Sequence, residues 1–87
     1  MIATEILIEI AGWTGAGMIL LAYILVTAEK LTGRSPAFQW LNLIGAAGFV
    51  ANGLWHGAMP SASLNVVWMA IAAFALIRLA QRRKADP

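Results

Sequence analysis

Residues 35–77 read SPAFQWLNLIGAAGFVANGLWHGAMPSASLNVVWMAIAAFALI, and this stretch of 43 residues contains no Asp, Glu, Lys or Arg. A second uncharged stretch of 19 residues, 10–28, precedes it. Because an α-helix rises about 1.5 Å per residue, roughly 20 mainly apolar residues cross the hydrocarbon core of a bilayer. The shorter stretch therefore predicts one membrane-spanning helix, and the longer stretch predicts two that are joined by a short turn.

The composition of the whole chain is also that of a membrane protein. Of its 87 residues, 61% are hydrophobic and 11% are charged, whereas about 25% charged is usual in soluble domains. Cysteine is absent and histidine occurs once, so no disulfide, thiolate site or zinc site is expected. Since the sequence shows no paired carboxylates and no nucleophile beside a base, we expect neither an enzyme nor a cofactor.

Helix-breaking residues lie between the predicted spans. Pro36 suits the first turn of a helix, where its missing N–H is harmless, and Ser35 precedes it as a candidate cap. The segment 56–60, His-Gly-Ala-Met-Pro, is the only breaker inside the long uncharged stretch. We therefore expect one all-α domain over residues 1–87, a bundle of three transmembrane helices. The expected bounds are about 6–28, 36–56 and 60–79, followed by a basic tail over 80–87.

The basic residues are distributed unequally between the two ends of this bundle. All six Lys and Arg residues lie in the 29–35 loop or in the C-terminal segment, and none lies near the N-terminus or the 57–60 turn. The positive-inside rule then places the N-terminus outside and the tail in the cytoplasm, with the basic residues near lipid headgroups and not on nucleic acid. Copies inserted in one orientation meet in parallel, most simply as a two-fold homodimer.

Each predicted helix carries polar and small residues on one face, counted at 100° per residue. On the first helix this face contains Glu9, Trp13, Leu20 and Thr27, flanked by Ala16 and Gly17. On the second helix it contains Gln39, Asn42, Ala46, Phe49, Gly53 and His56, with Asn52 at the edge. On the third helix it contains Ser61, Asn65, Trp68 and Ala72. A lone three-helix bundle is expected to be solid, and to be too small to satisfy four intramembrane amides. The faces are therefore expected to meet in a space shared by an oligomer.

The intramembrane amides and one tryptophan are the candidate substrate-binding residues, namely Asn42, Asn52, Asn65 and Trp68. An amide beside a flat aromatic ring suits a neutral, polar small solute. The same amides could instead form hydrogen bonds between helices. Trp68 lies about 12 Å below the start of its helix, too deep for an interfacial anchor, and either packs in the core or stacks on a solute.

Two further groups of residues have two interpretations each. The small residues 45–48, Gly-Ala-Ala-Gly, either let helix backbones approach closely or leave room for a solute. Glu9 and His56 both fall near the outer ends of their helices; in one interpretation they face one another and form a titratable gate or proton site. In the other interpretation, His56 ends its helix at the interface and Glu9 is simply exposed to water.

The order of these elements resembles the bacterial SemiSWEET half-transporters of the PQ-loop superfamily. Residues 53–57 (GLWHG), followed by Pro60, Ser61 and residues 64–67 (LNVV), are similar to that family's turn and its third-helix asparagine. The loop residues Lys30, Thr32, Arg34 and Ser35 resemble its cytoplasmic loop. The resemblance implies a parallel homodimer in the bacterial inner membrane, with a solute path on the two-fold axis.

The chain departs from that family at two places. The first helix contains no proline, and the tryptophan expected on the second helix falls at Asn52 or Gly53. Residues 55–65 are also similar to a group of small bacterial three-helix membrane proteins with a Tyr/Trp-His-Gly-Ala-x-Pro-Ser-Ala-x-Leu-Asn pattern, which implies no particular activity. Two function classes stay open: a dimeric small-solute transporter, and a non-transporting accessory or structural protein whose polar residues only hold helices together.

Overall fold

The computed structural model describes residues 2–85 as three α-helices joined by a loop and a tight turn. The helices are α1 (Ile2–Thr27), α2 (Pro36–Trp55) and α3 (Met59–Ala85). The prediction of an all-α chain with three helices is confirmed. Residues 86 and 87 of the predicted tail lie outside the described residues.

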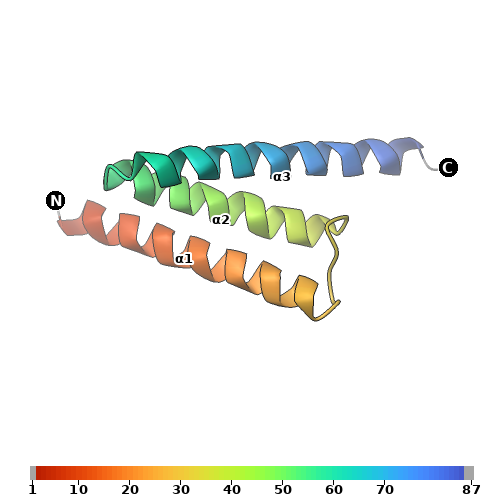
Figure 1. Cartoon of the computed structure of the whole chain (residues 1–87), viewed down its shortest axis with the longest axis horizontal. Helices are drawn as coiled ribbons and strands as arrows, with labels where there is room; N and C mark the ends of the chain where they lie inside the picture. Colours follow the sequence, from red (N-terminus) through yellow and green to blue (C-terminus); the bar gives the residue numbers. More distant parts are fainter. Residues whose placement is uncertain (1, 86–87) are drawn as a thin grey trace.

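The three helices do not form the solid bundle that we expected. α2 runs antiparallel to α1 and α3 and packs against both along its length, whereas α1 and α3 do not pack against each other. Figure 1 views the molecule with α2 behind the other two helices. The particle measures 53 × 24 × 22 Å, and one side of α2 is left uncovered between its neighbours.

The contact between α1 and α2 depends on glycine. A Cβ atom added to Gly15 would lie 2.5 Å from the carbonyl oxygen of Gly45, and one added to Gly48 would collide with the carbonyl oxygen of Ala11. Real Cβ atoms are essentially never closer than 3.0 Å to such an atom, so the two backbones are in direct contact. For Gly45 and Gly48, the close-packing interpretation is therefore the one that the structure supports.

Small residues also fill the contact between α2 and α3. Ala46 is fully buried at 0% exposure, and Ala62 and Ala72 are buried as well. A Cβ atom on Gly53 would lie 3.2 Å from that of Ala62. Because small residues occupy both interfaces of α2, the large apolar side chains point outward, among them Leu7, Ile24, Leu64, Phe74 and Ile77. This outward-facing apolar surface suits lipid.

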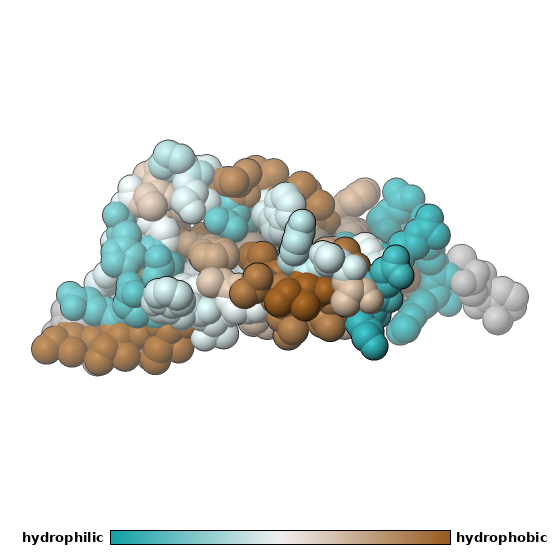
Figure 2. All heavy atoms as spheres, turned by 60° about the horizontal axis from the view of Figure 1, so that its bottom comes forward, coloured by the Kyte–Doolittle hydropathy of each residue, from teal (hydrophilic) through white to brown (hydrophobic). Residues whose placement is uncertain are grey.

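Two of the three helices are long and apolar enough to cross a membrane, over Ile2–Thr27 and Met59–Arg83. α2 has 20 residues and no charged side chain, but it contains Gln39, Asn42 and Asn52 and is not among the candidate spans. In Figure 2 hydrophilic atoms gather toward the two ends of the molecule, while hydrophobic and neutral atoms predominate between them. The structure thus gives two candidate spans where the sequence predicted three.

The helix ends differ from the expected bounds at both termini. α1 begins at Ile2, and α3 continues to Ala85, so residues 80–85 are helical and not a tail. Ala, Gln, Arg and Lys are good helix formers, and no Gly or Pro interrupts this segment. Ser35 occupies the N-cap position of α2 without capping it, because its hydroxyl accepts a hydrogen bond from the backbone N–H of Thr32 at 3.0 Å.

Candidate functional site

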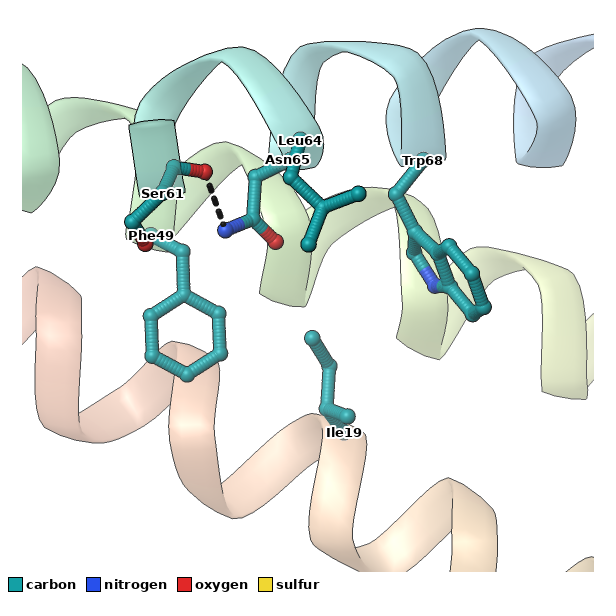
Figure 3. Close-up of a pocket in the computed structure, with 6 residues that line it drawn as sticks. All are labelled: Ile19, Phe49, Ser61, Leu64, Asn65 and Trp68. Atoms are coloured by element: carbon teal, nitrogen blue, oxygen red, sulfur yellow. Dashed lines mark hydrogen bonds between the residues drawn. The ribbon is translucent and has the colours of Figure 1, made fainter. Parts of the chain in front are cut away.

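A hollow of about 340 Å³ lies between α1 and α3, over the uncovered side of α2. Its lining residues are Ile19 from α1, Phe49 from α2, and Ser61, Leu64, Asn65 and Trp68 from α3. Figure 3 shows the Phe49 ring between the two outer helices, with the Asn65 amide beside it. The walls are mainly apolar. Apart from the indole N–H of Trp68, their polar side-chain groups are the hydroxyl of Ser61 and the amide of Asn65.

A second hollow of about 240 Å³ adjoins the first at Phe49. Its lining residues are Gly12, Trp13, Ala16, Phe49 and Asn52. We call the two hollows together the groove. Parts of all three predicted polar faces therefore converge within a single chain. Some residues of those predicted faces lie outside the groove. Leu20 is exposed on another part of the surface, and Ala46 and Ala72 are buried where the helices pack.

Asn42 is tied into the contact between α2 and α3. Its side chain is only 6% exposed. Its Nδ2 donates to the backbone oxygen of Phe38 at 2.8 Å, and its Oδ1 accepts from Nε1 of Trp68 at 3.1 Å. Asn42 lines neither hollow of the groove, so the structure gives it a helix-joining role. Because the N–H of Trp68 is already bonded to Asn42, Trp68 contributes only the ring of its indole to the groove wall.

Asn52 joins α2 to α1 and also lines the second hollow. Its Nδ2 donates to the backbone oxygen of Ile8 at 3.1 Å. The close approach requires Gly12, because a Cβ there would lie 2.6 Å from the same Nδ2. Asn52 therefore has both a packing role and a position on the groove wall.

Asn65 differs from the other two asparagines because it joins no helices. Its Nδ2 donates to the backbone oxygen of Ser61, one turn earlier in α3, at 2.9 Å. Among the side chains of residues 2–83 and the backbone of residues 2–85, no group donates a hydrogen bond to its Oδ1. The Asn65 carbonyl oxygen and the Ser61 hydroxyl are thus the polar groups that the first hollow can offer to a solute.

Glu9 and His56 lie side by side at the end of the molecule where α2 meets its turn to α3. The distance from Nε2 of His56 to Oε1 of Glu9 is 3.0 Å, and the two side chains are 50% and 53% exposed respectively. The two side chains thus face one another at hydrogen-bonding distance. Their role as a gate stays a prediction.

The four amides that the sequence analysis placed inside the membrane find partners within one chain, contrary to our expectation. Besides the three asparagines, Gln39 donates from Nε2 to the backbone oxygen of Gly33 at 2.8 Å. No buried side-chain nitrogen or oxygen in the described part of the chain lacks a hydrogen-bond partner. The expectation was wrong because backbone carbonyls one turn earlier, as well as those of Ile8 and Gly33, accept these bonds. Unsatisfied amides therefore give no argument for an oligomer.

Three groove residues, Gly12, Ile19 and Leu64, were not among the candidates that the sequence singled out. None of them has a polar side chain, and their positions depend on how α1 and α3 are placed across α2. Helical periodicity within one segment does not contain that information. The polar groove residues were found because a polar side chain in an apolar helix is unusual by itself.

A protein-family model matches residues 8–83. The chain belongs to this uncharacterised family. The match spans most of α1, all of α2 and nearly all of α3, and so includes every residue of the groove together with Glu9 and His56. The comparisons with curated proteins and with solved structures found no match.

Proposed function

We propose that the protein transports a small, neutral, polar solute across a membrane and that the groove is its binding site. The observation that carries the proposal is the hollow of about 340 Å³ with an unpartnered carbonyl oxygen, that of Asn65, on a mainly apolar wall. Ligand sites are commonly mainly apolar with a few placed polar groups. No charged side chain lines either hollow of the groove, which favours a neutral solute. No bond-making chemistry is part of this proposal.

The proposed transporter is a parallel homodimer. The groove opens on the side away from α2, so in a single chain Ser61, Asn65 and the indole of Trp68 would face lipid. Two copies related by a two-fold axis along the membrane normal would close groove against groove and enclose a solute path. Rocking of one copy against the other would then open the path alternately to the two sides, as in transporters built from repeats.

The proposal includes α2 as a third membrane span. Its polar residues are bonded within the chain, and α1 and α3 cover two of its sides, which supports a helix of modest apolarity in a bilayer. The charge distribution supports an external N-terminus and a cytoplasmic C-terminus in a bacterial inner membrane. Since the chain has no cysteine, A3C and A85C variants test this orientation directly. An impermeant thiol reagent should label A3C, and not A85C, in intact cells.

A non-transporting accessory or structural protein is the second candidate. The specific observation in its favour is that two of the four predicted substrate-binding residues, Asn42 and Asn52, bond to neighbouring helices. In this alternative the groove is filled by lipid chains or by a partner helix. Asn65 would then have no role beyond its local bond to Ser61.

Uptake into proteoliposomes separates the two candidates. Vesicles with and without the protein are shrunk by glycerol, glucose or glycine, and re-swelling is followed by light scattering. We expect faster re-swelling with at least one solute, and its loss in N65A. The matched control is Q81A, which removes an exposed amide from α3 outside the groove. A wild-type protein that moves none of these solutes, or equal rates for N65A and Q81A, would favour the accessory role.

A further inference from the structure

Three arginines surround a separate hollow at the basic end of the molecule. This hollow of about 270 Å³ is lined by Gly33, Arg34, Phe74, Ala75, Arg78, Leu79 and Arg82. Arg78 and Arg82 are one helical turn apart on a single face of α3, and Arg34 approaches from the loop that precedes α2. We call this site the arginine hollow. It shares no lining residue with the groove.

The arginines of this hollow have no acidic partner in the described part of the chain. The single ion pair among the side chains that the structure describes, those of residues 2–83, is Glu9–His56, which lies at the opposite end of the molecule. The Arg78 guanidinium lies 5.7 Å from the centre of the Phe74 ring, a cation–π contact that holds it beside the hollow. Three like charges around one space repel one another, and an anion between them would relieve that repulsion.

The depth of the hollow matches the phosphate level of a bilayer. Arg78 follows the start of α3 at Met59 by 19 residues, or roughly 28 Å at about 1.5 Å per residue. The hydrocarbon core is about 30 Å thick, so an α3 that begins at one edge of the core brings Arg78 to the other edge. The apolar part of the lining, Phe74, Ala75 and Leu79, extends from there toward the core.

We propose that the arginine hollow binds a phosphate group, and that its source is the headgroup of an anionic phospholipid. Guanidinium groups bind phosphate oxygens through paired N–H donors, and Arg34 and Arg78 reach the hollow from two different segments of the chain. The acyl chains of the lipid would lie along Phe74 and Leu79. The site would fix α3 to the loop before α2 at one membrane surface, independently of any transport.

Lipid titration with detection by native mass spectrometry tests this proposal. Wild-type protein in a non-ionic detergent is titrated with phosphatidylglycerol and, separately, with zwitterionic phosphatidylcholine. The site variant is R34Q/R78Q. The control is K30Q/R83Q, which removes the same charge from positions outside the hollow. A further variant, R34K/R78K, keeps the charge and removes the paired donors.

We expect wild-type protein to prefer phosphatidylglycerol, and R34Q/R78Q to weaken that binding by roughly ten- to thirtyfold. The control should lose less than about threefold, and the lysine variant should fall between them. Excess inorganic phosphate should not displace the lipid; if it does, the source is a free phosphate and the lipid assignment is wrong. Equal losses in site and control variants, or no preference over phosphatidylcholine in the wild type, would overturn the site. The wild-type comparison stands even if a variant fails to fold.

Discussion

The indole Nε1 of Trp68 donates a hydrogen bond of 3.1 Å to Oδ1 of Asn42 and thereby joins α3 to the buried face of α2. Among the described residues, this is the one side-chain to side-chain hydrogen bond between these two helices. Asn42 uses its amide nitrogen on Phe38 as well. The Asn42 amide therefore helps to hold α2 and α3 together, and its bond to Trp68 fixes one residue of the groove wall.

The variant W68F should destabilise the fold by about 0.6–2 kcal/mol, the range for interhelical hydrogen bonds in membranes. It keeps an aromatic ring and removes the donor, which leaves the buried Oδ1 of Asn42 without its partner. The measurement is the free energy of unfolding in mixed micelles, and W13F is the control because Trp13 is exposed and forms no side-chain hydrogen bond in the described structure. Equal stability losses in the two variants would show that the bond contributes nothing.

A pair of glycine substitutions tests the contact between α1 and α2. We expect G48A to cost about 1–3 kcal/mol of stability, because its Cβ would collide with the carbonyl oxygen of Ala11 and force the helices apart. G17A is the matched control, since a Cβ at Gly17 would meet no atom within 4 Å beyond the adjacent backbone of its own helix and alanine favours the helix by up to about 1 kcal/mol. The measurement is thermal unfolding in detergent. If G48A proved as stable as G17A, that result would contradict the close contact between α1 and α2.

The facing pair Glu9 and His56 should contribute little to stability. Both side chains are about half exposed, and such pairs typically contribute below about 1 kcal/mol. We expect E9Q and H56Q to unfold within that range of wild type while changing the rate of any solute uptake, which is the behaviour of a gate. A larger stability loss without a change in uptake would make the pair a structural clasp between α1 and α2.

The sequence was sufficient for the number and type of helices. Charge-free stretches fix where helices of membrane-spanning length can lie, and Pro36 and the Gly57 turn mark their limits. Gly57 adopts a φ of 71°, a left-handed conformation that glycine accepts without steric cost. These signals are local, so they can be recognised within a few residues of one another.

The arrangement of the helices and the partners of the amides could not be predicted in the same way. Whether α1 touches α3 depends on the two glycine- and alanine-rich faces of α2, which keep its neighbours apart. Asn42 and Asn65 have the same residue type and occur at similar places in their helices. One is buried against Trp68 and the other lines an open groove, a difference that only the packing of neighbouring helices decides.

The last prediction concerns the face through which two copies meet in the proposed dimer. Leu64 lines the groove, whereas Leu7 lines a different hollow on the far side of α1 and α2. Each leucine is 65% exposed, and each lies five residues after the first residue of its helix, so the two have similar exposure and depth. In a parallel dimer closed groove against groove, L64C should form a disulfide-linked dimer under mild oxidation, and L7C should not.

The cross-linking is measured in membranes at several lipid-to-protein ratios, because random collisions decline on dilution and a stable dimer does not. The absence of native cysteine means that any disulfide reports the introduced position alone. Cross-linking through L7C and not L64C would place the interface on the opposite face. The groove would then stay open to lipid, which contradicts an enclosed solute path between two copies.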